Sequence, residues 1–274
     1  MTVTDVDTAG TPRLSEADRR QYREDGFAVV RGLFTQDEVD ALCAEFEALH
    51  AAGRQVPGHF EPRAGAVDPL SVYPRVMHPH EIVPLARRVL LDARLRAVLE
   101  QLLDEEVLAA QSMFYFKPPG ARGQALHQDN FYLQVEPGTC VAAWLACDET
   151  DRDNGGLEVV PGTHRMDLFC PETADAQVSF AREYVPPPPG LATTPVDMAA
   201  GDVLFFNGSL VHGSQPNRSG DRFRRSFIGH YVGRSAERIG AYYRTMTMNG
   251  EPLALPVSEG AGPCGTEFAP AGPH

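Results

Sequence analysis

The stretch QALHQDNFYLQV, residues 124–135, contains a histidine and an aspartate two residues apart. Its apolar and aromatic residues are typical of a β-strand, in which successive side chains point to opposite faces. His127 and Asp129 would then lie side by side, with Gln128 turned away. An imidazole and a carboxylate placed in this way can chelate one metal ion. A solvated polar strand face is the alternative, which a His-x-Asp pair alone does not exclude.

A second histidine lies in LFFNGSLVHGSQPN, residues 204–217, after an apolar run that predicts a buried strand. Two histidines and one carboxylate on one face of an octahedral ion form the facial triad of non-haem Fe(II) oxygenases. Ser214 follows His212 by two residues and faces the same way. The chain then turns and returns as RFRRSFIGHYV, residues 222–232. An arginine buried there beside the metal is costly unless a carboxylate meets it, such as that of a bound organic acid.

The chain around these motifs divides into a helical and a β-rich part. Helix signals cover residues 15–106, where Ser15 and Thr35 are candidate N-caps and Glu38 completes a capping box. Short β-rich runs separated by Gly, Pro and Asp cover residues 107–235 and predict a sandwich or barrel. Residues 165–200 lack a clear period and indicate an inserted loop or lid. We expect a single α+β domain over residues 14–274, mainly β with flanking helices, after a disordered tail of residues 1–13.

The composition excludes several classes of partner. The chain has 274 residues, 43% apolar and 22% charged, which is typical of a soluble globular protein. A net charge of -13 without a basic patch disfavours nucleic acid and anionic membranes. The five cysteines are odd in number and lack Cys-x-x-Cys spacing, so we expect free thiols. Without a signal peptide or a membrane span, the expected location is cytoplasmic. A small molecule is the favoured partner.

Several stretches read together resemble the phytanoyl-CoA dioxygenase family of Fe(II)/2-oxoglutarate oxygenases. The matching stretches are DGFAVVRGLFTQDEVDAL (25–42), FYFKPPG (114–120), HQDN (127–130), DNGGLEVVPGTH (153–164), HGSQPNRS (212–219) and FRRS (223–226). The chain is also similar to the oxygenases that tailor hygromycin-type and other orthosomycin antibiotics. The resemblance implies a double-stranded β-helix, also called a jelly roll or cupin-like core, with the N-terminal helices packed on one sheet.

The resemblance also assigns roles to individual positions. It makes His127, Asp129 and His212 the ligands of Fe(II). It also implies that Ser214 and an arginine bind the distal carboxylate of 2-oxoglutarate.

Two neighbouring arginines compete for that role. We favour Arg224 over Arg225 because Arg224 shares a strand face with the small Ser226, which leaves room for a co-substrate. Gln111 resembles a contact to the other carboxylate of 2-oxoglutarate. Trp144 resembles a wall of the pocket, although a lone tryptophan in an apolar strand is equally well explained as core.

The implied enzyme is a non-haem Fe(II)/2-oxoglutarate-dependent dioxygenase that uses Fe(II), 2-oxoglutarate and O2. Its C–H abstraction would lead to hydroxylation or oxidative cyclization. Related halogenases replace the metal-binding carboxylate, so the presence of Asp129 disfavours chlorination. We expect a small-molecule substrate, sugar-like or aminocyclitol, in antibiotic biosynthesis. The alternatives are an acyl-CoA or lipid hydroxylase of the same family and a non-catalytic β-barrel binding protein.

The remaining histidines show weaker patterns. His78 and His80 flank Pro79 in a loop, and no carboxylate evidently completes a site there. A turn or substrate-pocket role is therefore favoured over a second metal. His230 has no ligand partner at metal-binding spacing in the sequence.

Overall fold

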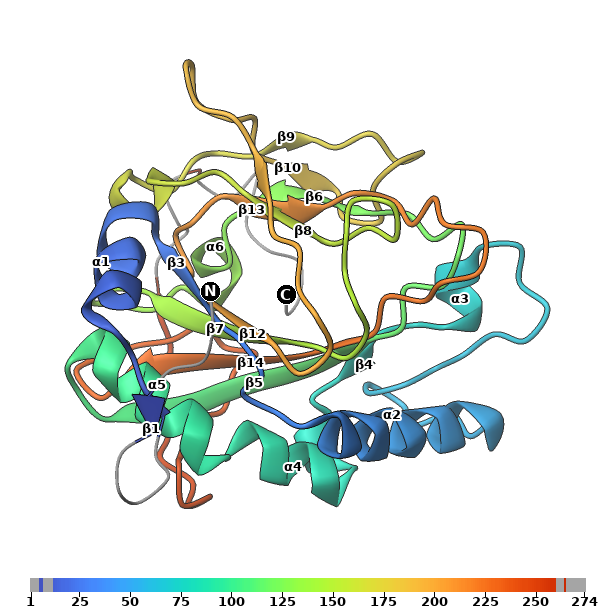
Figure 1. Ribbon diagram of the computed structural model, residues 1–274, viewed down its shortest axis with the longest axis horizontal. Coiled ribbons are helices and arrows are strands. Elements are labelled where there is room, and N and C mark those ends of the chain that lie inside the picture. The colour runs from blue at the N-terminus through green and yellow to red at the C-terminus, as the bar shows by residue number, and fades with distance from the viewer. Residues whose placement is uncertain (1–4, 7–11, 260–263, 265–274) are drawn as a thin grey trace.

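A computed structural model of the chain describes residues 5–6, 12–259 and 264. Its main feature is a pair of facing antiparallel sheets (Figure 1). The larger sheet contains, in spatial order, β15 (Met246–Thr247), β5 (Val107–Tyr115), β14 (Ser226–Gly233), β7 (Cys140–Ala146), β12 (Val203–Asn207) and β3 (Phe27–Val30), and β4 (Val76–Met77) also pairs with β5. The smaller sheet contains β11 (Thr194–Pro195), β8 (Leu157–Val159), β13 (His212–Ser214) and β6 (Gln124–His127). The predicted jelly roll is confirmed.

Two short ladders lie outside these sheets. One pairs β9 (Glu172–Thr173) with β10 (Glu183–Tyr184), inside the predicted insertion 165–200. The other pairs β1 (Asp5–Val6) with β2 (Pro12–Arg13). Of the predicted disordered tail, residues 1–4 and 7–11 lie outside the described residues, and the four others form this second ladder.

The first two helices begin at the caps that the sequence predicts. Ser15 and Thr35 each accept a hydrogen bond from the backbone three residues later, and in both cases the residue there caps in return. None of the described helices is both long and apolar enough to cross a bilayer, while the cytoplasmic location stays a prediction. The helical segments are α1 (Glu16–Asp25), α2 (Gln36–Ala51), α3 (Pro69–Val72), η1 (Pro79–Glu81), α4 (Pro84–Leu90), α5 (Ala93–Leu103), α6 (Asn130–Leu133) and η2 (Thr163–Arg165).

The N-terminal helices cover the outer face of the larger sheet, as expected (Figure 1). Val39, Leu42 and Phe46 recur at helical spacing on α2 and are fully buried. Phe46 stacks on Phe114 of β5 with ring centroids 3.9 Å apart. Full burial of each such side chain stabilises the fold by about 1.5–3 kcal/mol, so this contact fixes the sheet against the helices.

A second core fills the space between the two sheets. Trp144 of β7 pairs in register with Leu204 of β12 and Ile228 of β14, and all three side chains point inward. Leu157 of β8 meets them from the smaller sheet. The two sheets are therefore held face to face at the height where the histidines of β6 and β13 lie.

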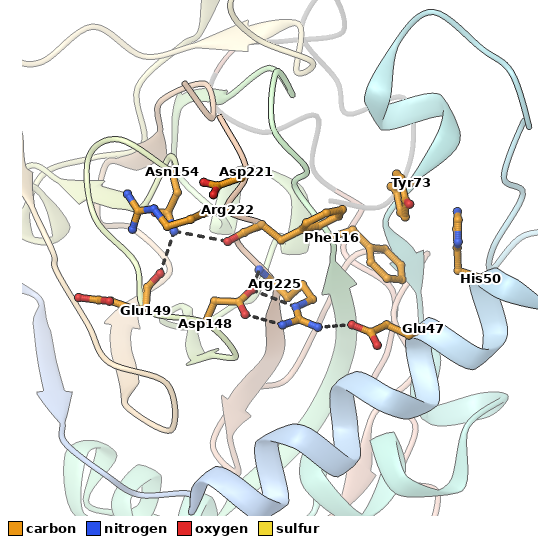
Figure 2. Close-up of a pocket in the computed structure, with 11 residues that line it drawn as sticks. Glu47, His50, Tyr73, Phe116, Asp148, Glu149, Asn154, Asp221, Arg222 and Arg225 are labelled. Atoms are coloured by element: carbon orange, nitrogen blue, oxygen red, sulfur yellow. Dashed lines mark hydrogen bonds and ion pairs between the residues drawn. The ribbon is translucent and has the colours of Figure 1, made fainter. Parts of the chain in front are cut away.

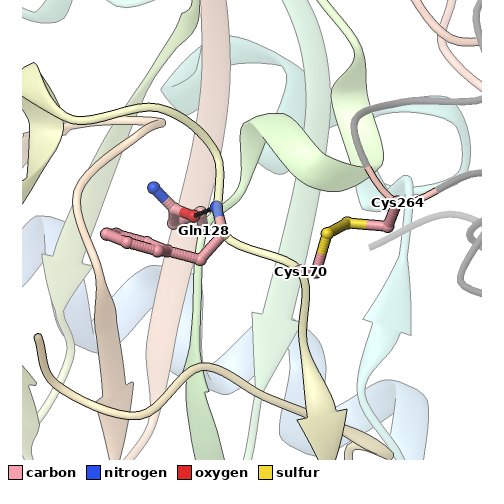
Figure 3. The surroundings of a disulfide bond; sticks show 4 residues. Gln128, Cys170 and Cys264 are labelled. Carbon is pink, nitrogen blue, oxygen red and sulfur yellow. Dashed lines mark hydrogen bonds between the residues drawn. A yellow bond between two sulfur atoms is a disulfide. The ribbon is translucent and has the colours of Figure 1, made fainter.

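The cysteines correct one prediction. Cys43, Cys140 and Cys147 are buried free thiols, but Cys170 and Cys264 form a disulfide (Figure 3). Their Cα atoms are 5.3 Å apart, which is normal for such a bond. The expectation of free thiols is wrong for this pair because 94 residues separate them, so that only the folded chain brings them together.

A thiol count checks this pairing. In denaturant without reductant, Ellman's reagent should detect the three free cysteines of the folded chain. After reduction and removal of the reductant, all five cysteines should react. Five reactive thiols before reduction would show that Cys170 and Cys264 are not bonded.

Candidate metal centre

The two histidines of the predicted triad face each other across two strands. His127 ends β6, His212 begins β13, and the antiparallel register pairs them directly. Their ring centroids are 4.3 Å apart. Cross-strand neighbours point to the same face of a sheet, so the pairing itself brings the two imidazoles together.

Backbone carbonyls orient both rings. His127 Nδ1 lies 2.8 Å from the Ala125 carbonyl oxygen, and His212 Nδ1 lies 3.0 Å from that of Leu210. A carbonyl can only accept, so the proton of each ring is on Nδ1 and each Nε2 carries a lone pair, as metal ligation requires. The lone pair of His127 faces the side-chain nitrogen of Gln124 at 3.2 Å, a contact that a metal ion would replace. Metal-binding histidines generally have such a partner at the second nitrogen.

Asp129 reaches the same point by a different route from the one predicted. The strand ends at His127, and Asp129 has helical backbone angles (φ -60, ψ -36) at the start of α6. Its carbonyl accepts hydrogen bonds from the amides of Tyr132 and Leu133, at 2.9 and 3.0 Å. These bonds stabilise a helical turn here in place of a continued strand. The strand-face argument is therefore wrong for Asp129, although its carboxylate still joins the two histidines.

The three side chains fit a divalent metal such as Fe(II). Asp129 Oδ1 lies 3.5 Å from Nε2 of both His127 and His212, and all three residues are buried. Ligands about 2.1 Å from an octahedral ion lie about 3 Å apart, so only a small contraction is needed. Burial lowers the pKa of His212 to about 4, against the nearby Asp129 carboxylate. This keeps the imidazole in its neutral, metal-binding form.

His230 holds the carboxylate in place from the opposite sheet. Its Nε2 lies 3.0 Å from Asp129 Oδ2, and both side chains are almost fully buried. This role of His230 was not predicted, although strand parity indicates it, because His230 shares a face of β14 with Ile228. The hydrogen bond leaves Asp129 Oδ1 directed at the histidines.

Gln128 points away from the metal, as predicted. Its side-chain nitrogen donates to the Ser209 carbonyl at 2.7 Å, and its oxygen accepts from the Phe169 amide at 2.8 Å. Figure 3 shows this contact close to the Cys170–Cys264 disulfide. The residue between two ligands thus anchors the start of the insertion 165–200.

Arg224 lies in the same small compartment as the triad, together with Ser214 and Trp144. Its guanidinium donates from Nη1 to Ser226 Oγ at 2.9 Å and lies 5.3 Å from the Trp144 ring centroid. Burial lowers the pKa of Arg224 to about 10. None of the ion pairs within the described part of the chain includes Arg224, so its buried charge has no carboxylate partner there.

Arg225 points to the other face of the sheet. Figure 2 shows its guanidinium between Asp148, at 2.6 Å, and Glu47 of α2. These residues line a cavity of about 650 Å³ between α2 and the end of the sheet, away from the triad. The predicted parity of the two arginines is thus seen in the structure.

Two further polar residues lie near this compartment. Gln111 is fully buried opposite His230 in the register of β5 and β14, and both of its amide atoms lack a hydrogen-bond partner among the described residues. It is not among the residues that line the compartment. Lys117, which the sequence analysis did not single out, donates from its buried ammonium to Ser214 Oγ at 2.9 Å.

Comparison with known proteins identifies relatives of the whole domain. The sequence model of a family described as phytanoyl-CoA dioxygenase (PhyH) matches residues 22–226. The peroxisomal phytanoyl-CoA dioxygenase of Mus musculus is 29% identical over 235 residues, which cover 80% of this chain and 68% of the relative. The ectoine dioxygenase of Bordetella bronchiseptica is 31% identical over 229 residues, covering 75% and 71%.

Solved structures share the fold. The epimerase SnoN from nogalamycin biosynthesis, in complex with Fe3+, α-ketoglutarate and nogalamycin RO, superimposes with a TM-score of 0.64 at 24% identity, covering 89% of this chain and 95% of that one. HygX from Streptomyces hygroscopicus, with nickel and 2-oxoglutarate bound, gives a TM-score of 0.59 at 17% identity, covering 82% and 89%.

Removing the partner of Asp129 should weaken the metal centre. His230→Ala should lower the affinity for Fe(II) or Co(II) by roughly 10–100-fold, as is typical for loss of a group that orients a ligand. Anaerobic calorimetric titration measures this change. His230→Gln, which keeps a side-chain donor, should lose less. Equal affinity in the wild type and the alanine variant would show that His230 does not position the carboxylate.

Proposed function

Because the chain belongs to the phytanoyl-CoA dioxygenase family, and is therefore a non-haem Fe(II)/2-oxoglutarate-dependent dioxygenase, we propose that it oxidises a C–H bond of a small molecule. Hydrogen abstraction then leads to hydroxylation or oxidative cyclization. We place this reaction in natural-product biosynthesis, specifically that of an antibiotic. Fe(II) held by His127, Asp129 and His212 would supply the oxidant from O2, one oxygen atom of which would oxidise 2-oxoglutarate to succinate and CO2.

One observation carries the choice of oxygenation over halogenation. The carboxylate of Asp129 is present, fully buried, and fixed by His230 at 3.0 Å with its other oxygen toward both histidines. A halide would need the coordination position that this carboxylate would take. The three residues would hold the ion and leave room for 2-oxoglutarate and O2.

We propose that Arg224 and Ser214 bind the distal carboxylate of 2-oxoglutarate. Support comes from the buried guanidinium, which has no carboxylate partner within the described part of the chain and lines the metal compartment. A planar fork of donors matches a carboxylate in two parallel hydrogen bonds. Trp144, stacked near Arg224, would form a wall of the pocket. The unpartnered amide of Gln111 would contact the second carboxylate after a small side-chain movement.

The substrate would enter beside Tyr115. This residue lines both the metal compartment and a neighbouring cavity of about 210 Å³. Tyr73, Phe116 and Phe180 join Tyr115 as the aromatic half of the eight residues that line that cavity, and Arg75 adds a cation. Aromatic faces and a few polar groups suit a single sugar-like or aminocyclitol ring by stacking and hydrogen bonding. The small volume favours such a compact group over a long acyl chain.

The insertion 165–200 borders this entrance. Phe180 lies 5.6 Å from the Arg75 guanidinium, and Glu183 accepts a hydrogen bond from Tyr132 Oη at 3.1 Å. Tyr132 follows the metal ligand Asp129 on α6, so the insertion contacts the centre through it. A segment in this position would exclude water that wastes the oxidant, and its movement would admit the substrate.

Two measurements test the function. Fe(II) and 2-oxoglutarate added without oxygen should give the weak visible absorption of chelation, and admission of oxygen should then yield succinate. We expect an aminocyclitol or amino-sugar glycoside to stimulate succinate formation, with a product that gains one oxygen atom or loses two hydrogen atoms. If acyl-CoA thioesters alone stimulate succinate formation, the chain is instead a lipid hydroxylase. The name of the mouse relative, phytanoyl-CoA dioxygenase, contains such a thioester.

Asp129→Ala should abolish both the chelation band and succinate formation, because it removes one of three protein ligands. Asp153→Ala, an exposed change in the loop before β8, serves as the control and should behave as the wild type. Full turnover in the Asp129→Ala protein would refute the iron assignment.

The two neighbouring arginines provide a matched pair for the co-substrate site. Arg224→Ala should weaken 2-oxoglutarate binding roughly 30-fold or more, as expected when one partner of a buried charge pair is lost. Arg225→Ala should leave that affinity unchanged, because Arg225 contacts Asp148 and Glu47 on the other face. Anaerobic titration of the chelation band with 2-oxoglutarate measures both. A larger loss in Arg225→Ala would reverse the assignment.

A further inference from the structure

A second group of metal-binding side chains lies outside the metal centre. His78, His80 and Glu81 offer ligand atoms that all lie within 4.8 Å of one another. These residues follow β4, which borders the larger sheet along β5 (Figure 1). The structure adds His59, from the preceding loop, whose Nε2 lies 3.7 Å from Glu81 Oε2. The carboxylate that was not evident from the sequence is therefore present, together with a third imidazole.

Hydrogen bonds orient two of these rings in the same way as in the metal centre. His59 Nδ1 lies 2.9 Å from the Met77 carbonyl oxygen, so it donates and leaves the Nε2 lone pair facing Glu81. His80 Nδ1 lies 2.7 Å from Ser112 Oγ, which can accept its proton, and His80 Nε2 lies 3.9 Å from Glu81 Oε1. Glu81 thus directs one carboxylate oxygen at each of two ring nitrogens, whereas the single atom Oδ1 of Asp129 faces both His127 and His212.

A bound cation would stabilise this arrangement. A neutral imidazole lone pair facing a carboxylate oxygen is repulsive, unless a proton or a metal ion lies between them. A metal ion at this point would accept the ring nitrogens of His59 and His80 and the Glu81 carboxylate together, and His78 lies within the same cluster of ligand atoms.

The backbone at His78 has an unusual conformation that supports this arrangement. His78 has φ +48, in the left-handed region that few residues other than glycine adopt. Its amide donates to the Ser112 carbonyl on the edge of β5 at 2.9 Å, which holds the turn. As a result His78 and His80, on either side of Pro79, have ring centroids 5.8 Å apart. A cost of about 1–3 kcal/mol at such a residue is commonly tolerated where a site needs it.

We propose that His59, His78, His80 and Glu81 form a second site for a divalent transition metal of the zinc or nickel type. Three imidazoles and one carboxylate are donors that suit these ions. Glu81 is about half exposed, with 47% of its side-chain surface accessible, so the ion can enter from solvent. The bound ion would tie the loop at residue 59 to the edge of β5. It shares no ligand with the first centre and does not depend on the proposed function.

Cobalt titration of the metal-free full-length protein tests the proposal, because Co(II) fits both sites and its visible absorption reports ligand geometry. We expect two ions per chain in the wild type and one in His212→Ala, with the remaining ion at the second site. Glu81→Gln and His59→Gln should each weaken the second ion roughly 10-fold or more while the first ion still binds. Glu45→Gln, an exposed change on α2, is the matched control and should bind two.

These variants distinguish the second site from the first. Glu81→Gln should keep the anaerobic chelation band of Fe(II) and 2-oxoglutarate, because Glu81 lies outside the triad. A wild-type protein that binds a single Co(II) ion, with none left in His212→Ala, would overturn the proposal. Binding of a second ion that is unaltered in both Glu81→Gln and His59→Gln would overturn it equally, because the ion would then lie elsewhere.

Discussion

The direct pairing of His127 with His212 in the smaller sheet is the constraint on which the site depends. A strand that slips by one residue turns every side chain to the opposite face, so any other register would separate the two imidazoles. Gly213 helps to hold the register, because a Cβ there would meet the Gln124 carbonyl oxygen at 2.8 Å. Close backbone packing beside the ligands thus fixes the positions of the two histidines before any metal binds.

The carboxylate of the triad depends on the other sheet. Asp129 comes from the turn after β6, but His230 of β14 holds it, and β14 belongs to the larger sheet. In the core between the sheets, Trp144 and Ile228 of the larger sheet cluster with Leu157 of the smaller sheet, which holds the two sheets at a fixed separation. The helices stabilise the arrangement from outside through contacts such as Phe46 on Phe114. Packing remote from the centre therefore determines ligand geometry within it.

Arg224 and Arg225, the two arginines just before β14, point in opposite directions. Arg224 faces the metal compartment without a carboxylate partner among the described residues, whereas Arg225 is paired with Asp148 and Glu47 on the helix side. The first arrangement leaves an electrostatic cost that a bound dicarboxylate would offset, and the second stabilises the free protein. Adjacent residues of one type thus have different roles because they point to opposite faces of one strand.

The sequence by itself determined whatever depends on neighbours along the chain. The capped helices, the inward face of β14 and the three ligands all follow from local hydrogen bonding, strand alternation and family motifs. Only the tertiary structure decided the contacts between distant segments. These are the His230 bond to Asp129, the Cys170–Cys264 disulfide and the approach of His59 to Glu81. The helical turn at Asp129 belongs with them, because a buried turn with satisfied backbone groups replaced the strand that local pattern predicted.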